Sequence, residues 1–197
     1  MSTQGIIFSL FFVLCGLLSA GAANEPPENN EPPQKKGASM KITITSTAFK
    51  HDEPIPKQHT GDGKDVSPPL AWTGVPENAK ELVLIVDDPD APRQDPWVHW
   101  VIYKLPPTLK GLPEGVAKDA KLKEPAGALH GMNSWGAPGY RGPAPPRGHG
   151  VHHYHFKLYA LDAALDVPAE LEKEALLAKM KGYVLAEGEL IGTYERK

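Results

Sequence analysis

An uninterrupted apolar run in the middle of the chain limits the fold more than any other feature. It lies between Glu81 and Asp87 and contains three β-branched residues. Such a run lacks the alternation of a half-exposed strand, so it predicts a central strand that is covered by protein on both faces. The chain has 21 prolines and 19 glycines among 197 residues, which favours a β-rich domain with long loops over a helical bundle.

Other segments have the composition of strands. Residues 41–46 alternate polar and apolar side chains, as expected for a strand with one buried face. Further strands are predicted at 99–105, 153–161 and 189–195, with a re-entry of the chain into the fold at 67–72. Long loops are predicted at 51–69 and 125–150.

One well-formed helix is predicted near the C-terminus. It opens at Pro168, acidic residues fill its first turns, and Gly182 ends it. Its apolar positions recur at helical spacing and are Leu171, Ala175, Leu176 and Met180. A second, short helix is predicted at 186–188, before the final strand.

The first residues have the pattern of an export signal. The apolar stretch from Ile6 to Leu18 is too short for a membrane span, which needs roughly 20 residues. Ala20 and Ala22 then satisfy the A-x-A cleavage pattern. Residues 1–22 are therefore predicted to be a signal peptide that is cleaved after Ala22 or Ala23, which makes the mature protein periplasmic or secreted.

Two alternatives to a cleaved signal stay open at this point. The residues before the apolar stretch carry no Lys or Arg, so the stretch would also suit an uncleaved N-terminal anchor. A lipid anchor would attach to Cys15, the one cysteine of the chain. This alternative is disfavoured because Leu14 stands where a small residue is normally required. If the signal is cleaved, the mature chain has no cysteine and therefore no disulfide.

Composition also predicts where the folded domain begins. Residues 23–39 are rich in Pro, Glu and Asn and hold no apolar cluster, so they cannot bury enough surface to fold. We predict a disordered tether over this stretch and a single domain over residues 40–197.

Acidic side chains follow the central apolar run, and a histidine opens the next strand. Asp88 and Asp90 flank Pro89 in a proline-stiffened segment, and His99 lies between hydrophobic neighbours. Taken alone, the aspartates would suit a turn with side-chain-to-backbone hydrogen bonds, and His99 a hydrogen-bonded core histidine. Rigid polar loops beside strands are nevertheless the usual way in which a scaffold presents a small binding site.

A second polar group opens the last strand but one. Side chains alternate between the faces of a strand, so His152 and Tyr154 are expected to share one face. The histidines beside them, His153 and His155, then share the other face, where they are packed or exposed. A carboxylate next to His99 or His152 would raise the imidazole pKa, and a protonated ring beside a tyrosine hydroxyl suits a phosphate.

The order of these segments is informative. The leading motifs are Asp88-Pro89-Asp90-Ala91-Pro92, Trp97-x-His99-Trp100, Gly142-Pro143-x-Pro145-Pro146 and His152-x-Tyr154. Further stretches are Asp62-Gly63, Ser67-Pro68-Pro69-Leu70-x-Trp72, Asn133-Ser134-Trp135-Gly136, Gly139-Tyr140-x-Gly142, Leu158-Tyr159-Ala160-Leu161-Asp162 and Gly192-Thr193-Tyr194. Together they resemble the phosphatidylethanolamine-binding protein family, and most closely its bacterial Raf-kinase-inhibitor-like branch, over about residues 40–197.

The resemblance implies a mainly β fold. This fold is an antiparallel β-sandwich of a large and a small sheet, with a few peripheral helices near the C-terminus. The resemblance also implies a small pocket that binds phosphate, acetate, cacodylate or phospholipid head groups. Carried over by motif, the expected ligand-binding residues are Asp88, Asp90, His99, Gly142, Ala144, His152 and Tyr154. Many family members have glycine where Ala144 stands, and eukaryotic members usually have arginine where His153 stands.

The implied function is the binding of a small anion or phospholipid head group in the cell envelope, without catalysis and without a cofactor. The family includes inhibitors of kinases and proteases, so a protein partner of that kind is a further expectation, as is a homodimer. The net charge of −3 and the pI of about 6.2 do not suggest a nucleic-acid partner.

Two other functions stay open. The aspartates and histidines would also serve as general acid and base in a phosphoester or ester hydrolase, although no Ser or Cys lies in a recognisable nucleophile motif. Zinc would find ligands in the two aspartates together with His149, His152, His153 and His155. The spacing of these histidines matches no closed site, so neither a metal site nor a catalytic residue is assigned.

Overall fold

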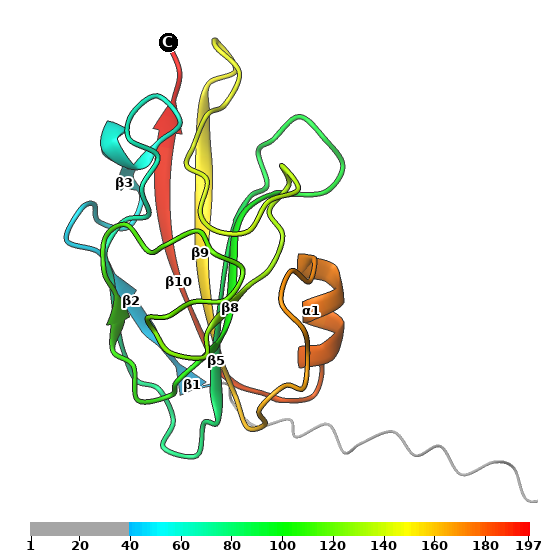
Figure 1. The fold of residues 1–197 in the computed structure, drawn as a ribbon. Helices are drawn as coiled ribbons and strands as arrows, with labels where there is room; N and C mark the ends of the chain where they lie inside the picture. Colours follow the sequence, from blue (N-terminus) through cyan, green and yellow to red (C-terminus); the bar gives the residue numbers. More distant parts are fainter. Residues whose placement is uncertain (1–39) are drawn as a thin grey trace, which may run out of the picture. The chain divides into compact units, whose positions relative to one another are not determined.

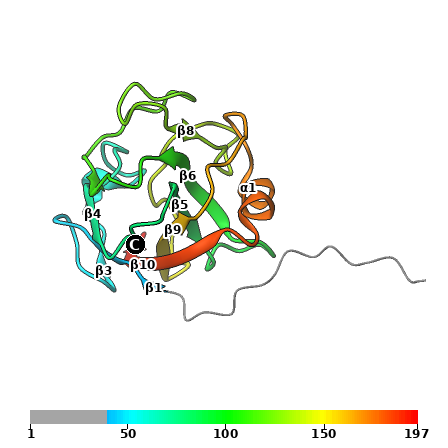
Figure 2. The ribbon, with the colours of Figure 1, turned by 90° about the horizontal axis from the view of Figure 1, so that it is seen from below.

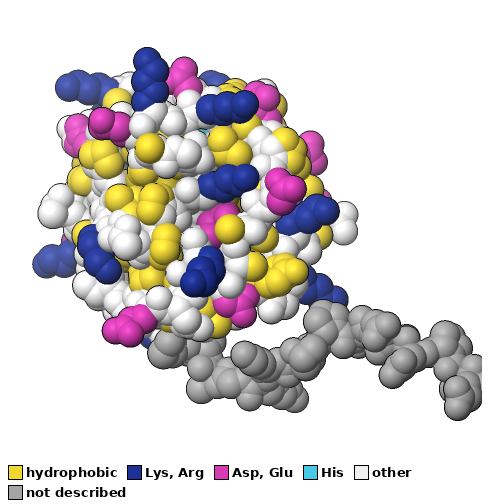
Figure 3. All heavy atoms as spheres, turned by 60° about the horizontal axis from the view of Figure 1, so that its bottom comes forward, with side chains coloured by type: hydrophobic (Ala, Val, Ile, Leu, Met, Phe, Trp, Pro, Cys, Tyr) yellow, Lys and Arg dark blue, Asp and Glu magenta, His cyan; other side chains and the backbone are white. Residues whose placement is uncertain are grey.

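The computed structural model describes residues 40–197, so the predicted signal peptide and tether lie outside the described residues. Within this range the chain forms two β-sheets (Figure 1), which confirms the expected mainly β architecture. No helix in residues 40–197 is long and apolar enough to cross a membrane. Figure 3 shows one face of the domain, where basic and acidic side chains are interspersed among apolar ones.

The larger sheet has seven strands. Its order is β1 (Met40–Lys41), β10 (Val184–Glu195), β9 (Val151–Leu161), β5 (Glu81–Asp88), β6 (Trp97–Leu105) and β8 (Leu129–His130), and β3 (Glu53–Pro54) also pairs with β10. The long strands are antiparallel to their neighbours, whereas β1 and β3 run parallel to β10. A short 3-10 turn, η1 (Lys57–His59), follows β3.

The smaller sheet consists of β2 (Thr43–Thr45), β4 (Leu70–Thr73) and β7 (Gly111–Leu112), all antiparallel. The predicted strand 41–46 is therefore divided between the two sheets, because its first part pairs with β10 and its second part with β4. Ile42 lies at the crossing with 1% exposure, and its amide donates to the carbonyl of Glu187. This one segment joins the two sheets.

Apolar layers cover both faces of β5, as its uninterrupted apolar sequence predicts. On one face Leu84 belongs to a core shared with Trp72 of the smaller sheet. On the other face Val83 packs in a second core with Leu176 of α1 (Lys173–Met180). Figures 1 and 2 show the smaller sheet and α1 on opposite sides of the central strands.

The sequence pattern predicts a helix that begins at Pro168, but the helix begins at Lys173. The backbone of Glu170 has a φ of 66°, which is incompatible with a right-handed helix, and its amide donates to the carbonyl of His130. The preceding segment therefore docks on β8 before the helix starts. The predicted end is confirmed, because Gly182 has a φ of 87°, a conformation that glycine adopts readily after a helix.

The prediction of a short helix at 186–188 is wrong, because these residues belong to β10. Pairing with β9 holds them in the sheet, as between Gly188 and Leu158. A Cβ on Gly188 would lie 2.1 Å from the carbonyl oxygen of Ile42. Glycine is therefore required where β10 passes the segment around Ile42 that joins the two sheets. This requirement explains why the composition of residues 186–188 is untypical of a strand.

Candidate functional site

Three strands of the larger sheet meet at one end and frame a cavity. β5 is antiparallel to both β6 and β9, so its carboxyl end lies beside their amino ends. The cavity there has a volume of about 300 Å³. It is lined by Asp88, Ala91, Pro92, Trp97, His99, Trp135, Ala144, Pro145, Pro146, His152 and Tyr154. Five of the seven predicted site residues are thus brought together.

His152 and Asp88 form a buried pair in the cavity wall. Nδ1 of His152 lies 2.7 Å from Oδ2 of Asp88, and the two side chains are 1% and 4% exposed. The other carboxylate oxygen accepts the backbone N–H of Asp90 at 2.9 Å. Nε2 of His152 lies 2.8 Å from Nδ1 of His149. Both ring nitrogens of His152 are therefore engaged within the protein, which fixes the ring in place.

A β-bulge brings His99 to the cavity. Val86 pairs with Trp100 and Asp87 pairs with Val98, so His99 has no partner on β5. A bulge re-aims side chains, because it adds one residue to one of the two strands. Trp100 accordingly packs in the core between the sheets and Val98 in the core beneath α1, while His99 lines the cavity. Strict alternation would place His99 and Trp100 on opposite faces.

The ring of His99 is held by the backbone of Arg141. Nδ1 donates to the carbonyl oxygen of Arg141 at 2.6 Å, and the amide of Arg141 donates to the carbonyl of His99 at 3.0 Å. Burial lowers the pKa of His99 to about 4, although the bond to Arg141 and the charge of Asp88 oppose the shift. The nearby carboxylate acts to raise this pKa, as expected, but desolvation outweighs it and the net shift is downwards. The neutral ring therefore has Nε2 as an acceptor.

Two hydrogen-bond donors in the lining have no partner. Within residues 40–197, the buried side-chain nitrogen and oxygen atoms that lack one are Nε1 of Trp97 and the hydroxyl of Tyr154. Burial raises the pKa of Tyr154, and the charge and closeness of the Asp88 carboxylate add to the effect, so the hydroxyl keeps its proton. No hydrogen bond of regular geometry joins this hydroxyl to Asp88. An unpaired buried polar group costs roughly 1–3 kcal/mol. Two such donors at one cavity suit a ligand with acceptor oxygens.

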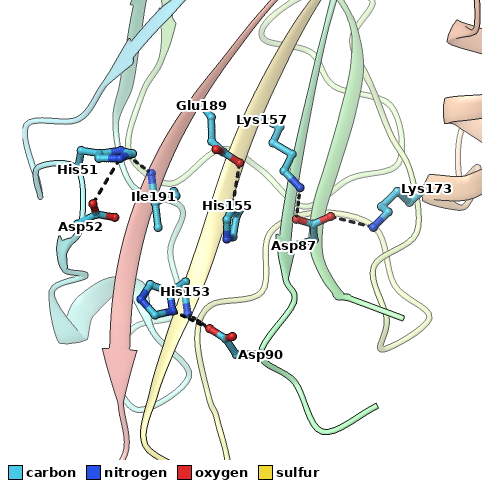
Figure 4. Close-up of polar contacts among 10 residues, drawn as sticks. All are labelled: His51, Asp52, Asp87, Asp90, His153, His155, Lys157, Lys173, Glu189 and Ile191. Atoms are coloured by element: carbon cyan, nitrogen blue, oxygen red, sulfur yellow. Dashed lines mark hydrogen bonds and ion pairs between the residues drawn. The ribbon is translucent and has the colours of Figure 1, made fainter. Parts of the chain in front are cut away.

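Asp90 does not line the cavity, contrary to its assignment by motif. Its carboxylate accepts hydrogen bonds from the side chain and the backbone of His153, at 2.7 and 2.8 Å (Figure 4). His155 lies on the same outer face and pairs with Glu189 at 2.7 Å. His153 and His155 thus face away from the cavity, as the alternation of β9 predicts. The backbone of Asp90 still supports the site, because its amide binds Asp88.

Gly142 also lies outside the cavity lining. A Cβ at this position would lie 2.2 Å from the carbonyl oxygen of His59, so no side chain fits between the two loops. Its amide donates to Asp65 at 2.6 Å. Gly142 therefore holds the loop that carries Ala144, and Ala144 itself lines the cavity.

The zinc alternative finds no support in the described residues. Within 40–197, no group of three or more His, Cys, Asp or Glu side chains has an arrangement that would hold a metal ion. The alternation of β9 separates His152 on the cavity side from His153 and His155 on the outer face. His149, His152 and Asp88 lie together, but their polar atoms contact one another.

Sequence reasoning assigned no binding role to the two tryptophans of the lining. Trp97 lies two residues before His99, and this spacing in a strand indicates that the two side chains share a face. Trp135 comes from the long 125–150 loop and is held there by Asn133, whose Oδ1 accepts the Trp135 amide at 3.0 Å. Its ring centroid lies 5.1 Å from those of both Trp97 and His99. No sequence pattern indicates these contacts.

Two arginines lie against these tryptophans. The guanidinium carbon of Arg93 is 5.2 Å from the ring centroid of Trp97, and that of Arg141 is 4.8 Å from the ring centroid of Trp135. Both arginines are exposed, and the lining itself includes no Lys or Arg. Positive charge therefore lies near the cavity but outside its lining, while the Asp88 carboxylate is part of the wall.

Relatives of known sequence are similar over most of the chain. A family model described as phosphatidylethanolamine-binding protein matches residues 45–195. A UPF0098 protein of Pyrococcus abyssi is 46% identical over 161 residues, which cover 82% of this chain and 89% of the relative. A UPF0098 protein of Methanothermobacter thermautotrophicus is 48% identical over 155 residues, which cover 79% of this chain and 99% of the relative.

Solved structures agree with this relationship. A phosphatidylethanolamine-binding protein homologue from Chlamydia trachomatis superposes with a TM-score of 0.71 at 42% identity, covering 81% of this chain and 100% of that chain. YbcL of Escherichia coli, described as a member of the mammalian family, superposes with a TM-score of 0.74 at 33% identity, covering 80% and 99%. The chain therefore belongs to the phosphatidylethanolamine-binding protein family.

Proposed function

We propose that this protein binds a small anion, either phosphate or a phosphate-bearing head group, in the cavity at the end of β5, and that it does so without turnover. One observation carries the proposal: the unpaired buried donors of Trp97 and Tyr154 belong to the same cavity lining. A ligand oxygen that accepts from each donor would remove both desolvation penalties. The name of the family points to a phospholipid head group as the ligand class, and free phosphoethanolamine is that head group as a phosphate monoester.

The surroundings of the cavity favour this ligand class. The volume of about 300 Å³ lies at the lower end of the range for small-molecule sites, which suits a head group better than a whole lipid. The exposed guanidinium groups of Arg93 and Arg141 would attract an anion to the cavity. Inside, the donors bind at fixed positions, because the bulge and the Asp88–His152 pair hold the wall rigid.

Calorimetry on the purified protein, titrated with phosphate and with phosphoethanolamine, tests the proposal. We expect saturable binding that Tyr154→Phe and Trp97→Phe each weaken about tenfold, the effect of one lost hydrogen bond to an anion. Tyr159→Phe is the matched control, since it removes a hydroxyl from the opposite face of β9 and should leave the Kd unchanged. Absence of binding, or equal effects of Tyr154→Phe and Tyr159→Phe, contradicts the proposal.

Phosphoester hydrolysis is the second candidate, and one contact favours it. The Asp88–His152–His149 chain resembles a histidine oriented as a general base. The lining contains no Ser, Thr or Cys, so water would be the nucleophile. Hydrolysis of p-nitrophenyl phosphate that is lost in His152→Ala and retained in His153→Ala would establish an enzyme. Equal background rates in both variants and the wild type would leave binding as the function.

We also assign the protein to the cell envelope, on the basis of the apolar stretch and the A-x-A pattern of residues 1–22. Mass spectrometry of the protein purified from its native cells is expected to show a mature N-terminus at Ala23 or Asn24. A protein that retains Met1 contradicts this assignment. Regulation of a kinase or protease, and a homodimer, stay predictions.

A further inference from the structure

The proposed anion site has a chemical preference that its donors and acceptors define. Resting on that function, we infer that the cavity selects a monoanion that still carries an acidic proton, such as the monoprotonated form of a phosphate monoester. Phosphodiesters, which include the phosphate of an intact phosphatidylethanolamine, and fully ionised anions are disfavoured. His99 is the residue that makes the distinction.

Three cavity groups are available to a ligand. Trp97 and Tyr154 each provide a donor without a partner. His99 provides an acceptor, because its Nδ1 donates to the carbonyl of Arg141 at 2.6 Å and Nε2 is the remaining ring nitrogen. His152 is excluded from this set, since its two ring nitrogens face Asp88 and His149 at 2.7 and 2.8 Å.

The charges of the lining limit how much negative charge the ligand brings. No Lys or Arg lines the cavity, whereas the buried carboxylate of Asp88 does. A second charge on the ligand would be desolvated without a compensating cation in the lining. Protonation of His99 does not supply one near neutral pH, because burial holds its pKa at about 4. The proton that bridges ligand and His99 therefore has to arrive with the ligand.

A monoprotonated phosphate monoester matches all three groups. Two of its unprotonated oxygens accept from Trp97 and Tyr154, while its P–OH group donates to Nε2 of His99. A phosphodiester has the same single charge, but a second ester group replaces the hydroxyl, so the acceptor of His99 stays unpaired. Discrimination of this kind is strong, because a buried polar group without a partner costs more than a hydrogen bond gains.

Methyl phosphate and dimethyl phosphate are matched probes. At pH 5 both carry one negative charge, and they differ in whether one oxygen bears a proton or a methyl group. Methyl sulfate adds a third monoanion without a proton. Calorimetry at pH 5 is expected to show methyl phosphate binding at least about tenfold more tightly than the other two, equivalent to one hydrogen bond.

A pH series separates ligand titration from protein titration. The titratable groups around His99 are Asp87 and Asp88 of β5, Asp65 of the loop before β4, and His152 and Tyr154 of β9. Dimethyl phosphate reports any effect of these groups, because it does not titrate between pH 5 and 8. Methyl phosphate is expected to lose its advantage over dimethyl phosphate above pH about 6, where its second proton dissociates.

His99→Asn tests the residue directly. The side-chain amide of asparagine retains a donor near the position of Nδ1 for the Arg141 carbonyl and removes Nε2. We expect this variant to bind methyl phosphate and dimethyl phosphate with similar affinity, while Tyr154→Phe weakens both and keeps their ratio. Near-ultraviolet circular dichroism confirms that each variant is folded. If His99→Asn does not fold, the three ligands on the wild-type protein decide the question.

The monoester has two sources, a lipid phosphate such as phosphatidic acid or a soluble metabolite. Sedimentation with phosphatidic acid vesicles, with and without methyl phosphate as competitor, distinguishes them. Equal affinity for the three methyl esters overturns the preference and leaves the anion site in place. Binding of none of them, nor of phosphate, overturns the proposed function itself.

Discussion

Neighbouring histidines of β9 make the same contact in opposite surroundings. Nδ1 of His152 lies 2.7 Å from Asp88, and Nδ1 of His153 lies 2.7 Å from Asp90. The inner pair is 1% and 4% exposed, whereas the outer pair is 47% and 41% exposed. The two pairs therefore contribute differently to stability although their distances are equal. Water screens the outer pair, whereas each partner of the inner pair is buried and has no water to replace the other.

The outer face shows the same contrast along its own length. Asp87 lies one residue before Asp88 and binds Lys157 at 3.0 Å and Lys173 at 2.8 Å (Figure 4). Its side chain is 4% exposed, because α1 covers this part of the sheet. The surroundings, and not the residue type, thus decide what each carboxylate of this segment does. Asp87 links the strands to the helix, Asp88 holds the cavity wall, and Asp90 forms a pair exposed to solvent.

The largest expected difference separates His152→Ala from His153→Ala. The first leaves the buried carboxylate of Asp88 without its imidazole, which costs about 3–5 kcal/mol of unfolding free energy. The second removes a solvent-screened contact worth less than about 1 kcal/mol, and the backbone amide of residue 153 still binds Asp90. Urea unfolding of both variants measures the difference. Similar losses would show that burial does not distinguish the two pairs.

The next effect concerns pH. Burial lowers the pKa of His99 to about 4 from an ordinary value of 6.5, so the folded protein binds fewer protons than the unfolded chain between these values. The contribution of His99 to the free energy of unfolding is therefore fully present above pH 6.5. It is lost as pH falls towards 4, and the loss is at most about 3 kcal/mol.

Urea unfolding between pH 4 and 7 checks this dependence, and His99→Asn should show a smaller loss than the wild type. His130, whose pKa is also lowered by burial, contributes equally to both proteins and cancels in the comparison. Tyr159→Phe is the control, because a tyrosine does not titrate in this range, and this variant should retain the full wild-type slope. A wild-type slope in His99→Asn would mean that His99 is not the group that titrates.

A smaller effect distinguishes two buried tyrosines of the core between the two sheets. The hydroxyl of Tyr140 donates to the carbonyl of His59 at 2.7 Å, whereas that of Tyr154 has no partner in residues 40–197. Tyr140→Phe is expected to cost about 1–3 kcal/mol, because it leaves the carbonyl unpaired. Tyr154→Phe is expected to leave the stability unchanged or slightly increased. Thermal unfolding measures both, and a large loss in Tyr154→Phe would reveal a structural role for this hydroxyl.

The smallest effect belongs to the outer pair. Partial burial raises the pKa of Asp90, but the hydrogen bonds from His153 outweigh it, so the pKa is lowered overall. A lowered carboxyl pKa stabilises the folded state above the ordinary aspartate pKa, and this contribution disappears as pH falls through the lowered value. Asp90→Asn should therefore cost less than about 1 kcal/mol at neutral pH, and high salt should reduce the cost. A salt-independent loss would contradict the solvent-screened description.

Much of the fold follows from local pattern. The apolar sequence of β5 predicts two covering layers, and the alternation of β9 predicts that His152 and Tyr154 share a face, because side-chain direction in a strand has a period of two. The start of α1 and the extent of β10 were not predictable in this way. Glu170 is held out of the helix by His130, and Gly188 is fitted to Ile42, so partners distant in sequence decide both.

For the site, the amino-acid sequence by itself determined the family, the strands that frame the cavity and five residues of its lining. Only the tertiary structure decided that a bulge brings in His99, that Gly142 and Asp90 build neighbouring structure, and that Trp97 contributes a donor without a partner. The physical reason is that motifs record which residues occur together. Register, burial and hydrogen-bond partners depend on segments that meet only in the folded chain. These three features decide which groups of the cavity donate hydrogen bonds and which accept them.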